Sequence, residues 1–242
     1  MIRFIILATV SLSAALPADA CRLQSASGKS TMIELFTSEG CSSCPPADRW
    51  LSQLKSSPLL WKKIIPIAFH VDYWDYLGWK DRLASNRNSL RQRTYRQKGH
   101  TSAVYTPGFF LNGQEWRPGG KAVKQTYPNP GVLSAKVQSD YIQVKFNSTL
   151  KAAKQAWVHI ALLGMNITNH IKSGENQGND LRHDFVVLSH QKHAVKFDGA
   201  KSQWHLPLTK TASNDPTKAI VVWVSLGSDP SPIQAAGNWC SL

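Results

Sequence analysis

The chain carries Cys41-Ser42-Ser43-Cys44-Pro45-Pro46 directly between an apolar run, residues 32–36, and an amphipathic segment that begins at Ala47. Apolar residues recur at helical spacing at positions 47, 50, 51 and 54, which predicts a helix with one buried face. The two prolines fit only in its first turn. We therefore expect Cys41 at or just before the helix N-terminus and Cys44 one turn further in.

This position predicts the chemistry of the two cysteines. Free N–H groups and the positive end of the helix dipole favour a thiolate at Cys41 and lower its pKa. Cys41 is thus the expected nucleophile, and Cys44 would attack the resulting mixed disulfide from the protein side. The intervening Ser42-Ser43 carries no fixed positive charge. The direction of the redox reaction therefore stays open.

Residues 1–20 have the pattern of a secretory signal. Arg3 supplies the positive start, residues 4–16 the apolar run, and Ala18-Asp19-Ala20 the cleavage site. The apolar run is too short to span a membrane, so we expect an exported protein, periplasmic or secreted, cleaved after Ala20. Cleavage there would leave Cys21 first, which raises lipid attachment as an alternative, although Ala18 stands where that signal expects Leu.

The two remaining cysteines, Cys21 and Cys240, lie near the ends of the mature chain. An oxidising compartment would permit a bridge between them. Such a bridge would close a very long loop and stabilise by roughly 3 to 5 kcal/mol on the chain-entropy model. Two free thiols are the alternative.

The formal net charge is +13. The densest basic segment, residues 82–98, indicates a solvated helix face, or alternatively a source of positive potential for the thiol site. Without a known binding module it does not indicate a nucleic-acid partner. The sequence predicts no membrane span after the signal and leaves the oligomeric state open.

Residues 30–118 read as strand, helix, strand, helix and hairpin. The second strand is the apolar run 64–69, and Asn112-Gly113 is a strong hairpin signal. His70 and Asp72 follow the second strand, so they are candidate accessory residues at the sheet edge that holds the thiols. A hydrogen-bonded structural histidine is an equal alternative for His70.

This order of elements, with CxxC at the first strand-to-helix turn, resembles the thioredoxin superfamily. The resemblance implies an exposed nucleophile at Cys41, a resolving thiol at Cys44 and a cis proline in Thr106-Pro107 beside the sulfurs. It also implies that Glu34 accepts the proton of the second thiol, although Glu34 sits one residue upstream of the usual position. An ordinary edge or loop carboxylate is the alternative for Glu34.

A closer resemblance covers both halves of the chain. Residues 36–48, 68–81, 91–93 and 105–107, and further on residues 174–187, are similar to an uncharacterised exported thioredoxin-like family, the domain of unknown function 1223. The family supplies no substrate. It implies a thioredoxin-like fold with a β-rich C-terminal part.

The second half of the chain has alternating runs typical of short strands. They cover residues 132–137, 141–146, 156–163, 166–172, 181–188 and 219–226. The predicted fold class is an α/β thioredoxin-like domain, residues 21–127, followed by a mainly antiparallel, sandwich-like β domain, residues 128–242. The polar loop 173–180 reads as a hairpin turn, or alternatively as a segment that reaches the thiol site.

The leading functional hypothesis is an exported thiol-disulfide oxidoreductase that needs no resident cofactor and acts on a protein or small-molecule thiol or disulfide. Metal handling is the first alternative, with both thiolates and His70 or His100 binding Cu(I) or Zn(II). A non-catalytic binding module with a permanent Cys41–Cys44 disulfide is the second.

Overall fold

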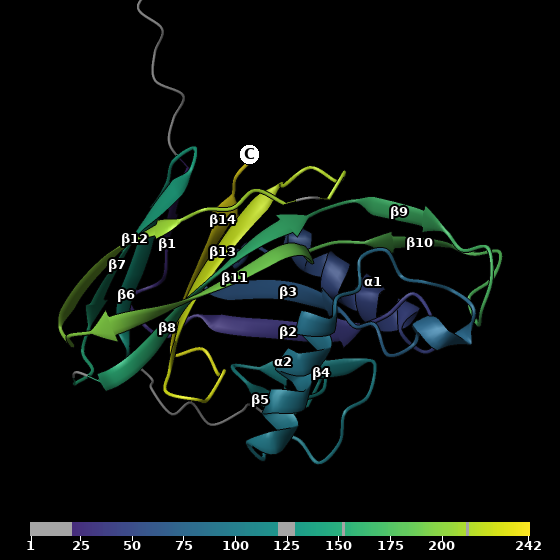
Figure 1. The fold of residues 1–242 in the computed structure, drawn as a ribbon, viewed down its shortest axis with the longest axis horizontal. Coiled ribbons are helices and arrows are strands. Elements are labelled where there is room, and N and C mark those ends of the chain that lie inside the picture. The colour runs from purple at the N-terminus through teal and green to yellow at the C-terminus, as the bar shows by residue number, and fades with distance from the viewer. Residues whose placement is uncertain (1–20, 121–128, 152, 212) are drawn as a thin grey trace, which may run out of the picture.

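The computed structural model describes residues 21–120, 129–151, 153–211 and 213–242 (Figure 1). Fourteen strands in three sheets, two α-helices and two short 3-10 helices make up this described part. The helices are α1 (Pro45–Gln53), α2 (Asn86–Gln97), η1 (Leu54–Ser56) and η2 (Asp75–Leu77).

The largest sheet has eight strands. Their spatial order is β14 (Gln234–Trp239), β13 (Ala219–Leu226), β8 (Ala153–Gly164), β11 (Val186–Phe197), β3 (Ile64–His70), β2 (Thr31–Thr37), β4 (Gly108–Leu111), β5 (Gln114–Trp116). A four-stranded sheet has the order β1 (Arg22–Gln24), β6 (Gly131–Val137), β7 (Tyr141–Ser148), β12 (Lys201–Pro207). The third sheet is a separate hairpin of β9 (Ile167–His170) and β10 (Asp180–His183).

The predicted fold class is wrong. The molecule is mostly β, and the described residues do not form an α/β thioredoxin-like domain followed by a separate sandwich. The reason lies in long-range pairing: β11 pairs in parallel with β3 through Val186 and Ala68, so strands from both halves share one sheet. The predicted boundary at residues 127/128 falls within 121–128, which lie outside the described residues, as does the predicted signal, 1–20.

The predicted order of elements and the predicted hairpin turn are confirmed. The elements within residues 30–118 follow the predicted order, β2 and β3 are parallel, and Asn112-Gly113 joins β4 to β5. Both turn residues have positive φ, 51° and 85°, as a tight two-residue hairpin requires. The predicted helix 82–98 is shorter, because the Ser85 side chain caps the first turn by accepting from the N–H of Arg87 at 3.2 Å.

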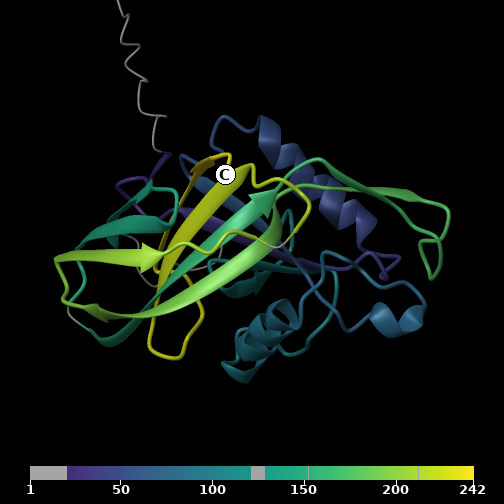
Figure 2. The same cartoon turned by 45° about the horizontal axis from the view of Figure 1, so that its top comes forward.

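The two larger of the three apolar clusters in the described part pack on the eight-stranded sheet. At one end the four-stranded sheet packs on it, and Val158, Ile160 and Leu162 of β8 face that layer. At the other end α1 and α2 lie on opposite sides of β2 and β3 (Figure 2). The alternation within β2 shows this, because Glu34 bonds to side chains of α2 whereas Thr37 bonds to Asp48 of α1.

Cys21 and Cys240 form a disulfide across 219 positions, which confirms the predicted bridge. Their Cα atoms are 5.7 Å apart, so the bridge ties the start of the described chain to its end. Of the two helices longer than one turn in the described ranges, neither is long and apolar enough to cross a membrane.

Candidate functional site

Cys41 and Cys44 form the second disulfide, at the start of α1. Pro45 and Pro46 occupy the first two helical positions, as predicted, and Cys44 is the N-cap residue. The helix therefore begins after both cysteines, and Cys44 does not lie one turn inside it. Cys41 is 1% exposed and Cys44 0% exposed, so the expected exposed nucleophile is buried in this disulfide form.

The Thr106–Pro107 peptide bond is cis, as the resemblance implied. Trp74 connects this loop to the disulfide segment. Its indole N–H donates to Thr106 Oγ1 at 2.7 Å, while its Cβ packs so closely on Gly40 that a side chain there would come within 3.0 Å of it. Gly40 is therefore required for the close approach. One aromatic side chain thus separates Thr106 from the residue before Cys41.

An apolar groove of about 350 Å³ adjoins Pro107. Its lining residues are Tyr105, Pro107, Phe109, Trp116, Arg117 and Pro118. Trp50 of α1 packs against two of these rings, at centroid distances of 5.3 Å from Phe109 and 5.9 Å from Trp116. The groove is therefore joined through Trp50 to the helix that follows the cysteines.

Glu34 lies on the α2 side of the sheet, away from α1. Its carboxylate accepts from Arg91 Nε at 2.7 Å and from the Tyr95 hydroxyl at 2.6 Å. Both Glu34 and Arg91 are buried. The structure thus pairs Glu34 with a guanidinium and does not bring it to Cys44. It also shows that the basic helix is not simply a solvated face, since Arg91 is a core residue.

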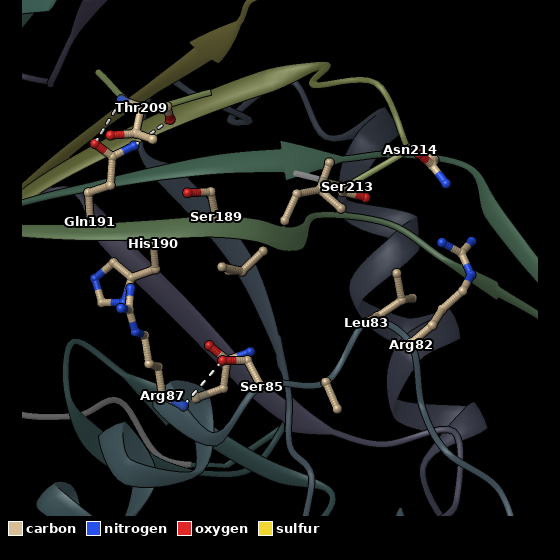
Figure 3. Close-up of a pocket in the computed structure, with 14 residues that line it drawn as sticks. Arg82, Leu83, Ser85, Arg87, Ser189, His190, Gln191, Thr209, Ser213 and Asn214 are labelled. Atoms are coloured by element: carbon tan, nitrogen blue, oxygen red, sulfur yellow. Dashed lines mark hydrogen bonds between the residues drawn. The ribbon is translucent and has the colours of Figure 1, made fainter. Parts of the chain in front are cut away.

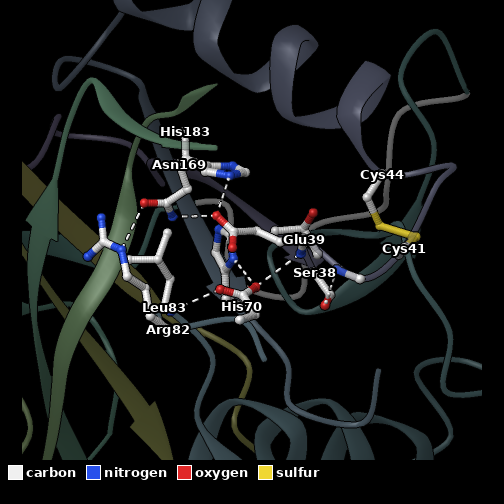
Figure 4. Close-up of polar contacts among 12 residues, drawn as sticks. Ser38, Glu39, Cys41, Cys44, His70, Arg82, Leu83, Asn169 and His183 are labelled. Atoms are coloured by element: carbon white, nitrogen blue, oxygen red, sulfur yellow. Dashed lines mark hydrogen bonds and ion pairs between the residues drawn. A yellow bond between two sulfur atoms is a disulfide. The ribbon is translucent and has the colours of Figure 1, made fainter. Parts of the chain in front are cut away.

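A buried cluster of five titratable residues includes Glu39, two residues before Cys41; Figure 4 labels its members Glu39, His70 and His183 together with the Cys41–Cys44 disulfide. We call Glu39, Asp48, His70, Asp81 and His183 the acid–histidine cluster; each is less than 9% exposed. His183 comes from β10, His70 from the end of β3 and Asp48 from the first turn of α1. Strands from both halves of the chain therefore build one polar site.

Two subsets of hydrogen bonds hold the cluster together. His70 Nδ1 donates to Asp81 Oδ2 at 2.7 Å, and the same oxygen accepts from the N–H of Glu39 at 3.0 Å. His183 Nε2 lies 3.2 Å from Glu39 Oε1, and its Nδ1 lies 3.8 Å from Asp48 Oδ2. The two imidazole rings meet edge to face at 4.7 Å. Among the described residues, His70 Nε2 and His183 Nδ1 have no hydrogen-bond partner.

Asp48 is the member of the cluster nearest to Cys44 along the helix. Its N–H donates to the Cys44 carbonyl at 3.1 Å, so the two residues share one helix face. Burial raises the pKa of Asp48, although the charges of His183 and His70 and a hydrogen bond from Thr37 oppose the shift. A carboxyl with a raised pKa is suited to exchange a proton near neutral pH.

His70 is a cation at neutral pH. Burial alone would lower its pKa, but the charge and hydrogen bond of Asp81, with the charges of Asp48 and Glu39, raise the pKa of His70 to about 9. The predicted accessory residue His70 thus belongs to the site. Asp72 does not, since it accepts from Ser89 Oγ at 2.5 Å. His100 is also elsewhere, 3.1 Å from Asp229.

The His70 pair makes stability depend on pH. Its folded-state pKa of about 9 exceeds the ordinary 6.5, so its contribution is complete below pH 6.5 and is lost as the pH rises through about 9. We expect the free energy of unfolding to fall by roughly 3 kcal/mol over this window. Urea unfolding of the oxidised protein between pH 6 and 9 measures the slope. His70→Gln should reduce the slope of the free energy of unfolding against pH. His170→Gln, at an exposed site, should leave this slope unchanged. Equal slopes in the wild type and both variants would contradict the assignment.

Sequence reasoning missed Glu39, Asp48, Asp81 and His183. A signal existed for two of them, because Glu39 precedes Cys41 by two residues and Asp48 follows Cys44 by four. The loop 173–180 does reach the thiol site, as the second of its two interpretations held. Asn176 Nδ2 donates to the carbonyl of Cys41 at 3.0 Å, and Glu175 accepts from the N–H of Ser42 at 3.0 Å.

A larger hollow, about 690 Å³, lies between the start of α2 and β11 (Figure 3). Arg82, Arg87 and His190 are among its lining residues, and it includes neither the cysteines nor the acid–histidine cluster. Burial, with the nearby charge of Arg91, lowers the pKa of His190 to about 3. The His190 imidazole is therefore neutral at pH 7. Because its lining includes no residue of the thiol site, the hollow is a separate feature of the structure.

Within the described ranges, no group of three or more His, Cys, Asp and Glu side chains has the arrangement of a metal site. The fold and the site together define a mostly-β protein in which a CxxC disulfide at a helix start adjoins a buried acid–histidine cluster.

The chain belongs to the family described as protein of unknown function DUF1223, which matches residues 32–225. No curated protein matches it. A solved structure of a protein from Agrobacterium tumefaciens, a structural-genomics target, is 26% identical with a TM-score of 0.63, covering 86% of this chain and 93% of that one. HBP35 of Porphyromonas gingivalis is 15% identical with a TM-score of 0.56, covering 88% and 75%, and shows similarity of fold alone.

Proposed function

We propose that the protein is a thiol–disulfide exchange protein whose reactive pair is Cys41 and Cys44. The observation that carries the proposal is the acid–histidine cluster, which includes Glu39, two residues before Cys41, and Asp48, one helical turn after Cys44. Burying three carboxylates and two imidazoles is unfavourable, and a purely structural crosslink does not need them. Clusters of buried titratable groups concentrate at sites that move protons.

Loop size separates the roles of the two disulfides. On the chain-entropy model a bridge between Cys41 and Cys44, three positions apart, stabilises by about 2 kcal/mol, whereas one across 219 positions stabilises by about 5 kcal/mol. Cys21–Cys240 is therefore the structural bridge. The short loop gives the Cys41–Cys44 pair a small structural role, and reduction of this pair leaves the long crosslink in place.

The exchange reaction balances without a cofactor. In the direction that reduces a partner, the Cys41 thiolate attacks one sulfur of the partner disulfide, forms a mixed disulfide and releases the first partner thiolate. Cys44 then loses its proton and attacks Cys41 Sγ, which releases the second partner thiolate. The protein dithiol loses two electrons and the partner disulfide gains them. The reverse sequence oxidises a partner dithiol.

The test is the equilibrium of the Cys41/Cys44 pair in a glutathione and dithiothreitol series, with free thiols assigned by alkylation and peptide mass. A reversible two-electron transition confined to Cys41 and Cys44 supports the proposal, and its midpoint gives the direction of exchange. A pair that stays oxidised throughout would contradict exchange and favour the binding-module alternative. Stoichiometric metal on the reduced protein would favour metal handling.

We propose that Asp48 accepts the proton that the Cys44 thiol loses when it attacks the mixed disulfide. Cys44 is fully buried, so water cannot reach its thiol to accept the proton. Asp48 lies one helical turn away on the same face of α1. His183, with Nδ1 3.8 Å from Asp48 Oδ2, continues the chain of polar groups toward Glu39. Asp48 thus takes the role that the resemblance implied for Glu34.

Asp48→Asn is expected to slow the attack of Cys44 on a mixed disulfide by about 100-fold or more, because an amide cannot accept the proton. The first step, attack by Cys41, should change little. Stopped-flow release of a chromogenic thiolate from a Cys41 mixed disulfide measures the second step separately. Asp72→Asn is the matched control, since Asp72 bonds to Ser89 outside the cluster. An unchanged rate in Asp48→Asn, or an equal loss in the control, would remove the assignment.

A further inference from the structure

The β9–β10 hairpin reaches from the second half of the chain to the disulfide. Its two strands form a sheet of their own (Figure 1), and its loop, residues 171–179, forms hydrogen bonds with the CxxC segment. We call residues 171–179 the clasp. Nothing in the exchange reaction described above uses it.

Two side chains of the clasp hold the backbone around Cys41. Asn176 Nδ2 donates to the carbonyls of Glu39 at 2.8 Å and Cys41 at 3.0 Å. Glu175 Oε2 accepts from the N–H of Ser42 at 3.0 Å. A third contact anchors the loop, as Ser173 Oγ donates to the carbonyl of Gly78 at 2.5 Å.

The contacts of Asn176 are buried and those of Glu175 are at the surface. Asn176 is 4% exposed and Cys41 is 1% exposed, so both residues are buried. Breaking its two buried hydrogen bonds leaves carbonyls without partners, which is unfavourable. Asn176 therefore holds the Cys41 backbone in its covered position, and a reductant reaches the disulfide only when this segment opens.

Glu175 opposes the formation of a thiolate at Cys41. The N–H of Ser42, next in sequence to Cys41, is a donor that a Cys41 thiolate would otherwise attract, and Glu175 occupies it. The hydrogen bond from Ser42 lowers the pKa of Glu175, so the carboxylate is charged at neutral pH. A negative charge near a thiol favours the protonated form.

We propose that the clasp sets the reactivity of the Cys41–Cys44 pair, with Asn176 controlling access to the disulfide and Glu175 disfavouring the Cys41 thiolate. Both are positioning residues, since neither contacts a sulfur atom in the described hydrogen bonds. The proposal deepens the exchange function and rests on it.

Glu175→Gln tests the electrostatic part. Gln keeps an acceptor oxygen for the Ser42 N–H and removes the charge, while every member of the acid–histidine cluster stays unchanged. We expect the pKa of the Cys41 thiol to fall by about one unit. The pH dependence of Cys41 alkylation by iodoacetamide, in protein with the Cys41–Cys44 pair reduced, measures it. Asp180→Asn, at an exposed carboxylate of the same hairpin, is the control and should show no shift. An unshifted pKa in Glu175→Gln would overturn the electrostatic part.

Asn176→Ala tests access. We expect dithiothreitol to reduce the Cys41–Cys44 disulfide about tenfold faster, because two buried hydrogen bonds no longer oppose opening. Asn176→Asp is a second variant that keeps the size of the side chain and removes its donors, so it should also react faster. Circular dichroism establishes that each variant is folded. Wild-type rates in both folded variants would overturn this part of the proposal.

These measurements separate the clasp from the exchange function. Alkylation and reduction by a small reagent need no partner and no turnover. If the wild-type pair fails to equilibrate with glutathione while Glu175→Gln still shifts the pKa, the exchange function fails, and only the effect of Glu175 on the Cys41 thiol is supported. If the pair equilibrates and neither variant changes pKa or rate, the clasp alone fails.

Discussion

Cys41→Ser is expected to abolish exchange, reducing the rate to that of the uncatalysed thiol and disulfide. The reason is that Cys41, which precedes α1, is the proposed nucleophile, and a serine hydroxyl in its place cannot form the mixed disulfide. The rate of reduction of a small disulfide substrate by the protein measures the loss. Serine preserves the size of the side chain, and loss of the short crosslink removes only about 2 kcal/mol of stability.

Cys44→Ser should behave differently from Cys41→Ser. Cys41 can still attack a partner, but nothing resolves the product, so mixed disulfides accumulate. Non-reducing mass analysis after incubation with oxidised glutathione should find one glutathione on Cys41. Ser43→Ala is the control that keeps both thiols; it removes only the hydroxyl 3.3 Å from Cys41 Sγ and should retain exchange. Full turnover in either cysteine variant would exclude the mechanism.

Features of the fold that depend on neighbouring residues could be predicted from the sequence. Pro45 and Pro46 mark the start of α1, and Asn112-Gly113 marks the β4–β5 turn, because each acts on the backbone within a few positions. The run 219–226 coincides with β13. The run 181–188 does not, since β10 ends at His183 and β11 begins at Val186, with Phe185 at positive φ between them.

Pairing between distant strands could not be predicted. An apolar run shows that a strand is buried but does not show which strand lies next to it, so the joining of β3 to β11 within one sheet was missed. The same limit applies to the site. His183 reaches Glu39 across 144 positions, and Asn176 reaches Cys41 across 135. Only the folded hairpin brings them to the cysteines.

Glu34 shows how a residue can be recognised as important and assigned the wrong neighbours. The resemblance implied a buried carboxylate at Glu34, but the sequence did not show which helix covers its face of the sheet. In the structure α2 covers this face, and its Arg91 forms an ion pair with Glu34. The Arg91 guanidinium also lies 5.1 Å from the ring centroids of Tyr95 and Trp223. The ion pair is therefore enclosed by aromatic rings.

Arg91→Met is expected to lower the free energy of unfolding by about 3 to 5 kcal/mol, because it leaves the buried Glu34 carboxylate without its cation. Urea unfolding at pH 7 measures the loss. Glu34→Leu should be similarly destabilising, since it leaves the guanidinium unpaired. Arg87→Met, at an exposed position of the same helix, is the matched control and should change stability by less than about 0.5 kcal/mol.

The double variant Glu34→Leu/Arg91→Met distinguishes a required ion pair from a replaceable one. Removing both charges removes the unpaired group, so the double variant should recover most of the stability lost in either single variant. Its exchange rate, measured as for the cysteine variants, should equal that of the wild type, because Glu34 and Arg91 lie on the α2 side of the sheet and Asp48 on the α1 side. Recovered stability with lost exchange would return the proton-accepting role to Glu34 and contradict its assignment to Asp48.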